Sequence, residues 1–310
     1  MQIKSSLDNL LTPTAIALGN FDGIHRGHLE VIKPVLELDD PDCYKTVVTF
    51  DPHPQEFFTG QQRQLITPQP EKAMILEQLG IQQLVLLPFD RELVKLSPQE
   101  FVTQILNNRL QSKFVSVGED FRFGNQRAGA AADLVQLTAD VDITTKIAPL
   151  EQNGESRISS SRIRAALLAA DLQLTKTLLG RYYSIVGTVI NGQEIGRSIG
   201  FPTANLKYPP EKFLPRQGVY CVRVDTATQQ QLPGVMNIGK RPTVNGVNTT
   251  IEVHLLDWDG NLYEQQLTIY LHQFLRSEQK FPDLTALTNQ IQADCDTARV
   301  FFQIQSSQNI

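Results

Sequence analysis

The chain has 310 residues, of which 41% are hydrophobic and 20% are charged, a composition typical of packed globular proteins and a length that suggests two domains. The formal net charge is −5 and no run of lysine and arginine stands out, which argues against a nucleic-acid groove and a polybasic membrane patch. Three widely spaced cysteines, no signal-peptide core and no apolar stretch of about 18 residues together predict a cytoplasmic protein with free thiols.

The first half of the sequence alternates between strand and helix signals. Short apolar strands are predicted at Thr14–Leu18, Thr46–Phe50, Leu84–Leu87, Phe114–Val117 and Ile143–Ile147. Helices are predicted at Glu71–Leu79, from the Ser97 capping box to about Leu110, at Asp133–Leu137, and after the cluster Ser159–Ser161. Strands that are apolar on both faces predict an α/β domain with a doubly wound, Rossmann-like parallel sheet covered by helices.

The pattern changes near Tyr183, where short β-rich segments are broken by glycine and proline. Strands are predicted at Ile185–Ile190, Gly218–Val224, Gly234–Ile238, Thr250–Leu256 and Leu267–His272, with a hairpin loop at Thr226–Gln231 and a closing helix at about Asp283–Phe302. Many short strands with turn signals indicate a small antiparallel β-barrel with a terminal helix. We therefore expect two domains, residues 1–182 and 183–310.

The segment from Gly19 to His28 (GNFDGIHRGH) follows the first predicted strand and opens a helix. Ligands of doubly wound sheets bind there, and a helix N-terminus offers free N–H groups to phosphate. His25 and His28 would donate N–H bonds to phosphoryl oxygens, and Gly27 would allow close approach. We expect Gly19, Phe21 and Gly27 to belong to an ATP site. The alternatives are a turn with two exposed histidines and, less favoured because no third ligand is suitably spaced, a zinc site.

Two further elements of the first half would complete this site. In ISSSRIR, the hydroxyl of Ser160 at a helix start and the guanidinium groups of Arg162 and Arg164 predict a triphosphate clamp, although serine-rich N-caps are common. The segments TFDPHP and VGEDFRFG each follow a predicted strand, where substrate pockets form. In the second of these we single out Asp120 and Phe123. The alternatives are a rigid proline turn and aromatic core packing.

The most informative segment of the second half runs from Gly187 to Asn205 and contains GRSIGFPTAN. Gly192, Gly196 and Gly200 recur at four-residue spacing, so that their amides, with Arg197, could cover phosphates. Thr203 and Asn205 supply oxygen atoms suited to Mg²⁺. A glycine-rich hairpin followed by a proline turn is the alternative. The residues GVMNIGKR imitate part of a P-loop, but Arg241 and Pro242 follow its lysine, so we reject that interpretation.

Taken together, GNFDGIHRGH, TFDPHP, VGEDFRFG, ISSSRIR and GRSIGFPTAN resemble, in order and over nearly the whole chain, the bacterial bifunctional riboflavin kinase/FAD synthetase family. The resemblance implies a cytoplasmic flavin enzyme that uses ATP and Mg²⁺ to convert riboflavin to FMN and FMN to FAD. By the same resemblance, Glu252 is the catalytic base of the kinase and Arg276 reaches the flavin-nucleotide phosphate. Asp120 and Phe123 would line the flavin side, and His25, His28, Arg164 and Ser160 would hold ATP.

The chain departs from the family pattern at Ala130, where aspartate is frequent, at Glu264, where glycine is usual, and at Ser161, where threonine is usual although serine still supplies a hydroxyl. We expect Glu264 to occupy a turn that does not demand positive φ. A tRNA-charging role would need an anticodon-binding extension and a basic surface, and neither is recognised in the sequence. Two other functions are a relative that adenylylates another phosphate substrate and a non-catalytic flavin-binding protein. The phosphate-binding residues and Glu252 are retained, which argues against both. Neither a nucleic-acid nor a membrane partner is expected, and self-association stays open.

Overall fold

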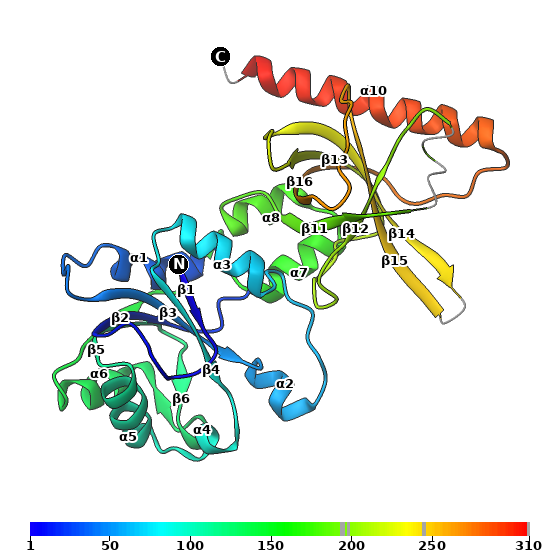
Figure 1. The fold of residues 1–310 in the computed structure, drawn as a ribbon. Coiled ribbons are helices and arrows are strands. Elements are labelled where there is room, and N and C mark those ends of the chain that lie inside the picture. Colours follow the sequence, from blue (N-terminus) through cyan, green and yellow to red (C-terminus); the bar gives the residue numbers. More distant parts are fainter. Residues whose placement is uncertain (193–195, 197–198, 244–245, 309–310) are drawn as a thin grey trace. The chain divides into compact units, whose positions relative to one another are not determined.

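The computed structural model describes residues 1–192, 196, 199–243 and 246–308 (Figure 1). The chain divides into two compact units, Met1–Arg162 and Ile163–Ile310. Two helices, α7 (Ser160–Leu168) and α8 (Leu172–Leu179), lie along the chain between the parallel sheet and the barrel described below. Across the described ranges, no helix is both long and apolar enough to cross a membrane.

The first unit is built on a parallel sheet, as predicted. The strand order is β1-β4-β3-β2-β5-β8, and every neighbouring pair is parallel. The strands are β1 (Gln2–Lys4), β2 (Thr14–Leu18), β3 (Tyr44–Asp51), β4 (Gln83–Pro88), β5 (Ser112–Gly118) and β8 (Thr144–Ala148). Two small hairpins, β6 (Arg122–Phe123) with β7 (Gly129–Ala130) and β9 (Gln152–Asn153) with β10 (Ser156–Arg157), accompany it.

Helices cover both faces of this sheet, which gives two hydrophobic cores. Ala15 and Ala17 of β2 face one core with α1, and Ile16 and Leu18 face the other. The helices of the unit before α7 are α1 (Arg26–Leu36), α2 (Pro54–Thr59), α3 (Gln69–Gln78), α4 (Arg91–Lys95), α5 (Pro98–Glu100), the π-helix η1 (Phe101–Arg109), the 3₁₀ turn η2 (Asn125–Arg127) and α6 (Ala131–Ala139). Burial on both faces explains why the strands read as continuous apolar runs.

The capping box predicted at Ser97 is present, with Ser97 Oγ accepting from the Glu100 N–H and the Glu100 carboxylate accepting from the Ser97 N–H. The helix continues as η1 and ends close to the predicted Leu110. Its π-helical hydrogen bonding was not predicted, because a one-residue widening of the turn leaves no periodicity signal over so short a segment.

The second unit contains a closed antiparallel barrel with strand order β11-β12-β15-β14-β13-β16 (Figure 1). Its strands are β11 (Ser184–Ile190), β12 (Ala204–Lys207), β13 (Gly218–Asp225), β14 (Leu232–Thr243), β15 (Gly246–Leu255) and β16 (Gln266–Arg276). The terminal helix α10 (Leu284–Gln308) begins after Asp283, whose carboxylate accepts from the Ala286 N–H. The predicted barrel and closing helix are confirmed, and β12 is the strand that periodicity did not reveal.

The turn before β16 corrects one expectation. Glu264 has a φ of +64°, so this position does demand the left-handed conformation that glycine adopts without strain. The turn is fixed by long-range pairing, because the Glu264 N–H donates to the Val189 carbonyl and the Val189 N–H to the Gln265 carbonyl. Closure of the barrel therefore dictates the backbone, and Glu264 adopts a strained conformation there.

Candidate functional site

A cavity of about 760 Å³ opens at the carboxyl ends of the parallel strands in the first unit. Its lining includes eight of the residues predicted from the sequence: Gly19, Phe21, His25, Gly27, His28, Asp120, Phe123 and Ser160. They come from the loop after β2 and the start of α1, from the segment after β5 that includes β6, and from the start of α7. The strand-helix topology therefore brings together residues separated by more than a hundred positions, at the edge where open α/β sheets bind ligands.

The loop after β2 is held in a strained shape by Asp22. The buried carboxylate of Asp22 accepts from the N–H groups of Ile66 (2.8 Å) and Thr67 (3.3 Å) through Oδ1. Phe21 and Ile24 in the same loop have φ values of +47° and +40°. Non-glycine residues in that region cost free energy and persist only where surrounding contacts impose them, commonly at functional sites.

The two histidines of the first motif are stacked at the start of α1. Their ring centroids are 3.6 Å apart with an interplanar angle of 14°. His25 is the N-cap, and its Nδ1 accepts from the His28 N–H at 3.2 Å. Neutral His25 must then carry its proton on Nε2. A Cβ at Gly27 would lie 3.3 Å from the His25 ring, so glycine leaves room for this stack.

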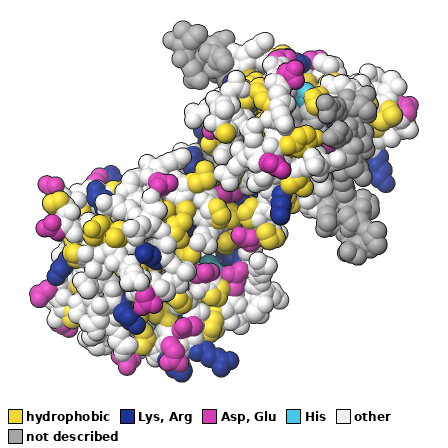
Figure 2. All heavy atoms as spheres, in the orientation of Figure 1, with side chains coloured by type: hydrophobic (Ala, Val, Ile, Leu, Met, Phe, Trp, Pro, Cys, Tyr) yellow, Lys and Arg dark blue, Asp and Glu magenta, His cyan; other side chains and the backbone are white. Residues whose placement is uncertain are grey.

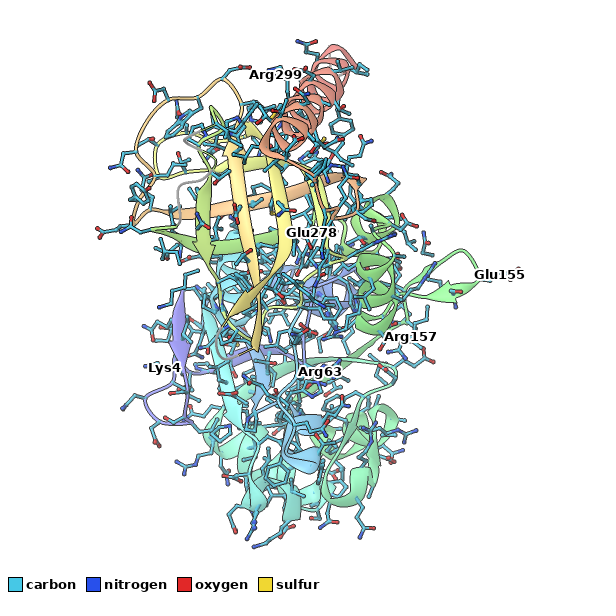
Figure 3. All side chains as sticks on the ribbon, turned by 90° about the vertical axis from the view of Figure 1, so that its right-hand side faces the viewer. Lys4, Arg63, Glu155, Arg157, Glu278 and Arg299 are labelled. Atoms are coloured by element: carbon cyan, nitrogen blue, oxygen red, sulfur yellow. The ribbon has the colours of Figure 1, made fainter. Side chains whose placement is uncertain are left out.

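The three residues singled out in the serine-arginine motif make contacts in different parts of the molecule. Ser160 lines the cavity, and its hydroxyl donates to the Asp22 carbonyl at 2.8 Å, tying α7 to the strained loop. The Arg162 guanidinium donates to the carbonyls of Asn153 and Ser156. It therefore holds the β9-β10 hairpin, which projects from the unit with Glu155 at its tip (Figure 3). Arg164 belongs to the second unit, where its guanidinium lies 5.5 Å from the centroid of the Phe213 ring.

The cavity wall on the β5 side combines charge with aromatic surface. Asp120 is exposed and accepts from Arg157 at 2.5 Å. Phe123 is buried and stacks against Phe121, with centroids 5.7 Å apart and an interplanar angle of 13°. Phe123 is thus a core residue, as the packing alternative predicted, and also part of the cavity lining, while its contact with flavin stays a prediction.

The TFDPHP segment contains the N-cap residue of α2 and lies beside the same cavity. His53 caps α2, its Nδ1 accepting from the Gln55 N–H, and Arg63 Nη1 lies 3.3 Å from its Nε2. Burial, reinforced by the nearby Arg63 charge, lowers the pKa of His53 to about 4. Arg63, labelled in Figure 3, also donates to the Gln55 side chain at 2.8 Å. The ring of His53 therefore remains neutral near pH 7.

In the second unit, strand pairing groups the predicted kinase residues. Glu252 on β15 is the register partner of Asn205 on β12 and of Asn237 on β14. Direct cross-strand partners project to the same face, so the carboxylate has a side-chain amide on each side. Ile251 and Val253 are buried while Glu252 is only partly covered, as the alternation predicted.

Two glycines of the glycine-rich loop, Gly192 and Gly196, lie close to the predicted metal ligands. A Cβ at Gly192 would overlap the Asn205 side-chain amide, and one at Gly196 would lie 3.2 Å from Thr203 Oγ1. Gly200 has a φ of +87°, which favours glycine. Thr203 and Asn205 offer the hydroxyl and amide oxygens that suit Mg²⁺, so the residues present fit this cation. The predicted phosphate ligand Arg197 lies outside the described residues.

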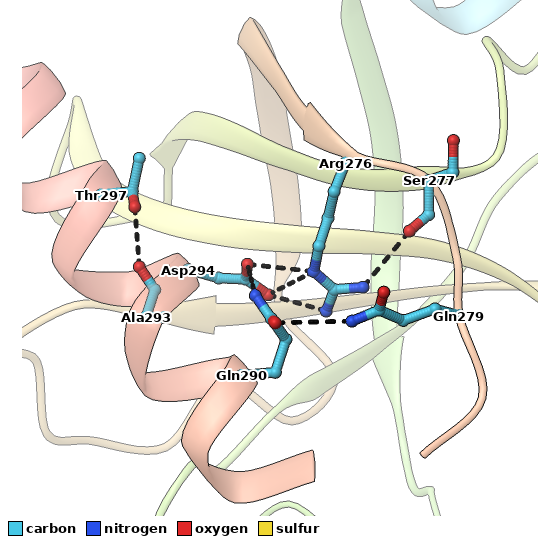
Figure 4. Close-up of polar contacts among 7 residues, drawn as sticks. All are labelled: Arg276, Ser277, Gln279, Gln290, Ala293, Asp294 and Thr297. Carbon is cyan, nitrogen blue, oxygen red and sulfur yellow. Dashed lines mark hydrogen bonds and ion pairs between the residues drawn. The ribbon is translucent and has the colours of Figure 1, made fainter. Parts of the chain in front are cut away.

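Arg276, at the end of β16, is engaged by the terminal helix. Its Nε lies 3.0 Å from both carboxylate oxygens of Asp294 on α10, and its Nη2 lies 2.8 Å from Oδ2 (Figure 4). No group of three or more His, Cys, Asp or Glu side chains suited to a metal ion occurs among the residues that the structure describes.

Comparison with known proteins assigns each half. The FAD synthetase family model matches residues 8–162, and the riboflavin kinase family model matches residues 179–302. The bifunctional riboflavin kinase/FMN adenylyltransferase of Pseudomonas fluorescens is 39% identical, covering 96% of this chain and 97% of its own. The protein of the same name from Escherichia coli K12 is also 39% identical, covering 93% and 92%. This chain belongs to the bifunctional riboflavin kinase/FMN adenylyltransferase family.

The family fold extends over both units. A solved structure described as a macrolide-efflux protein from Streptococcus pneumoniae matches with a TM-score of 0.84 at 28% identity, covering 96% of this chain and 98% of that one. The FAD synthetase match ends at Arg162, where the first compact unit ends, and the riboflavin kinase match includes all six barrel strands. The cavity and the Glu252 cluster therefore lie in different matched segments.

Three residues of these sites were not singled out from the sequence. Asp22 and Asn237 stood within recognised motifs without a role, since their contacts depend on distant segments. Lys72 on α3 is 8% exposed and donates to the Asn20 carbonyl at 3.1 Å. Burial lowers the pKa of Lys72, opposed by the carboxylates of Asp22 and Asp51. The sequence signal that could have drawn attention to Lys72 was the presence of a lysine on a helix otherwise expected to pack against the sheet.

Proposed function

We propose that the chain makes FAD from riboflavin in two ATP-dependent steps, with residues 183–310 as the kinase domain and residues 1–182 as the adenylyltransferase domain. In the first step, the terminal ribityl hydroxyl attacks the γ-phosphate of ATP, releasing ADP and FMN. In the second, an FMN phosphate oxygen attacks the α-phosphate of ATP, releasing pyrophosphate. The support is the family membership together with two separate groups of polar residues, one in each unit.

The observation that carries the kinase assignment is the strand register around Glu252. Asn205 and Asn237 are its direct neighbours on β12 and β14, so the carboxylate faces polar groups at the edge of the glycine-rich loop. In this proposal Glu252 accepts the proton of the ribityl hydroxyl as that oxygen attacks. The amide neighbours would orient the carboxylate without adding charge.

Phosphate binding by the kinase domain would involve the loop and two oxygen ligands. Gly192, Gly196 and Gly200, with Arg197, would cover the ATP phosphates, and Thr203 and Asn205 would hold Mg²⁺. Mg²⁺ held there would neutralise negative charge that develops on the phosphoryl oxygens. The close approach of the Gly196 backbone to the Phe201 carbonyl and to Thr203 Oγ1 supports this arrangement, because a side chain at that position would overlap the Phe201 carbonyl and crowd the Thr203 hydroxyl.

In the adenylyltransferase domain, the phosphates of ATP would lie at the N-terminus of α1. Gly19, Phe21 and Gly27 shape that end of the cavity, and His25 and His28 would donate N–H bonds to the leaving pyrophosphate. The Nε2 proton assigned to His25 supports this role. Ser160, Arg162 and Arg164 would contribute further phosphate contacts. The Ser160 hydroxyl would then exchange its bond to Asp22 for one to phosphate.

The flavin would occupy the opposite wall of the same cavity. Phe123 offers an aromatic surface in contact with Phe121, and Asp120 lies at the edge. In the kinase domain, Arg276 would reach the phosphate of FMN. Reaction in a reducing cytoplasm fits the three buried free cysteines, whose thiol pKa values are raised by burial to about 11 or 12. Neither nucleic acid nor membrane enters this proposal.

A chromatographic assay tests the whole proposal. Purified protein is incubated with riboflavin and ATP, with Mg²⁺ or with a chelator, and the flavins are separated. FAD formed only with Mg²⁺ is the expected result. FMN alone would support the kinase and contradict the second step, unless FMN supplied under reducing conditions is adenylylated. Unchanged riboflavin together with unchanged FMN would leave a flavin-binding protein as the better account.

A further inference from the structure

The guanidinium of Arg276 is held along one edge by a buried carboxylate. Nε and Nη2 both donate to Asp294, at distances of 2.8 to 3.0 Å, and the Asp294 side chain is only 7% exposed (Figure 4). This side-on, bidentate pairing fixes the plane of the guanidinium as well as its position. The pair joins the end of β16 to the first half of α10.

Asp294 is in turn fixed by its own helix and by the loop that follows Arg276. Gln290, one helical turn earlier, donates to Asp294 Oδ1 at 3.0 Å, and Gln279 donates to Gln290 Oε1 at 3.4 Å. The carboxylate therefore accepts from both an arginine and an amide. A buried carboxylate with this many donors has a fixed orientation and passes it to its partner.

The side-on pairing leaves the outer edge of the fork, formed by Nη1 and the second hydrogen of Nη2. The contact found on this edge is a long one, from Nη1 to the Ser277 carbonyl at 3.3 Å. The Ser277 hydroxyl accepts from a second guanidinium, Arg216 Nη2, at 3.0 Å. Two guanidinium groups therefore converge on Ser277. The outer edge of an arginine fork matches the spacing of two phosphate oxygens.

This segment adjoins the residues assigned to phosphoryl transfer. The carboxylate of Glu278, labelled in Figure 3, approaches Gly239 so closely that a Cβ at Gly239 would overlap it. The same Cβ would lie 3.0 Å from Asn237 Nδ2. Asn237 is the register partner of Glu252. The loop that begins at Arg276 thus approaches the strand beside the proposed catalytic base.

We propose that Asp294 is a positioning residue of the kinase: it orients Arg276 so that the outer edge of its guanidinium binds the phosphate of FMN. The inference rests on the proposed riboflavin kinase function. Pre-orientation lowers the rotamer entropy that Arg276 would lose on binding phosphate, so removal of Asp294 weakens the contact although the arginine remains. Riboflavin has no phosphate, and its binding does not depend on this contact.

Inhibition by the product tests the proposal with the full chain. Adenylylation releases pyrophosphate, so ADP release from ATP and riboflavin reports the kinase alone. We expect Asp294→Asn to raise the inhibition constant of FMN about tenfold, the loss expected for a charge-assisted hydrogen bond, while the KM for riboflavin changes less than twofold. Arg276→Lys, which keeps the charge and loses the fork, should give a similar rise. The double variant should show no further loss.

Asp257→Asn is the matched control, because Asp257 forms another ion pair with α10, to Arg299 Nη2 at 2.9 Å. It should leave FMN inhibition unchanged. Equal changes in the two flavin constants for Asp294→Asn, or an unchanged FMN constant with reduced thermal stability, would show that the pair is only structural. Tighter FMN inhibition would show that Asp294 competes with phosphate for Arg276. Each of these results overturns the proposal.

A milder variant covers the case in which Asp294→Asn does not fold. Gln290→Ala removes the amide that fixes the carboxylate at a half-buried position, and it should raise the FMN inhibition constant about threefold. An unchanged constant there contradicts the proposal. If the unmodified chain releases no ADP with riboflavin, the kinase assignment itself is wrong. If the unmodified chain releases ADP with riboflavin and is inhibited by FMN, variants that leave the FMN inhibition constant unchanged contradict only the role proposed for Asp294.

Discussion

In the parallel sheet, the residues around the cavity come from loops that follow the strands, whereas in the barrel Glu252 and Asn205 lie within paired strands. Loops need additional contacts to hold them, and the Asp22 carboxylate and the buried Lys72 side chain supply these to the first motif. The backbone of strand residues needs fewer such contacts, because the ladder of hydrogen bonds sets the spacing along and between strands. The adenylyltransferase site should therefore tolerate distant changes less well than the kinase site.

On the face drawn in Figure 2, each unit carries a mixture of basic and acidic side chains. The difference between the two sites therefore does not arise from a strongly charged surface on that side. It arises from how each fold positions a few polar groups. If this is correct, changes in one site should leave the chemistry of the other intact.

The largest effect is expected from Glu252→Gln. The amide keeps the size of the side chain but cannot accept the ribityl proton, so FMN formation should fall about 10²- to 10⁴-fold. FAD formation from added FMN should remain normal. Glu264→Gln, the same change at an exposed turn, is the control. Initial rates by chromatography measure both reactions, and loss of both together would contradict independent sites.

The reverse contrast is expected from His28→Ala. Removing one donor to the leaving pyrophosphate should slow FAD formation from FMN about 10²-fold or more, while riboflavin phosphorylation continues unchanged. Because His28 stacks on His25, thermal unfolding must be recorded in parallel. A normal rate of FAD formation in a folded variant would show that this histidine pair is only an N-cap.

An effect of intermediate size is expected on the pH dependence of the stability of each unit. Burial, with smaller contributions from Arg223 and Lys176, lowers the pKa of His272 on β16 to about 4 from an ordinary 6.5. The unfolded chain therefore takes up the proton first, and stability falls as the pH decreases from about 6.5 to 4. Allowing for solvent screening, the loss attributable to His272 is about 1–2 kcal/mol.

His272→Phe should remove this part of the pH dependence, because His272 stacks on Tyr182, with centroids 3.8 Å apart, and phenylalanine preserves that packing. His53→Asn, which retains an N-cap acceptor, should remove the corresponding part from the first unit, where the pKa is also lowered to about 4. Urea unfolding at pH 7 and pH 4.5 measures both. An unaltered difference between the two pH values in either variant would contradict its assignment.

The smallest effect is expected from Glu264→Gly. Relief of the left-handed strain at φ +64°, offset by the greater freedom of glycine in the unfolded chain, should stabilise the second unit by about 0.5–1 kcal/mol. A small rise in its unfolding temperature, with both activities unchanged, is the expected outcome. A decrease would mean that the glutamate side chain contributes a contact that offsets the strain.

The sequence by itself determined most elements and the positions of the motifs on them. Continuous apolar strands between helices indicated the parallel sheet, alternation in β16 indicated a half-buried strand, and the Ser97 capping box located a helix start. Such signals are local, since they depend on periodicity and on side chains within one turn of a helix. The short strand β12 gave no comparable signal, because four residues are too few for alternation to stand out.

Only the tertiary structure decided which side chains meet. Asp22 contacts Ile66 and Thr67, some 44 positions away, and Asn237 reaches Glu252 through the register of two strands. The pairing of Arg276 with Asp294 required the terminal helix to return to the end of β16. These contacts depend on loop closure and strand register, which the whole fold sets, and a one-residue shift in register would turn each side chain to the other face.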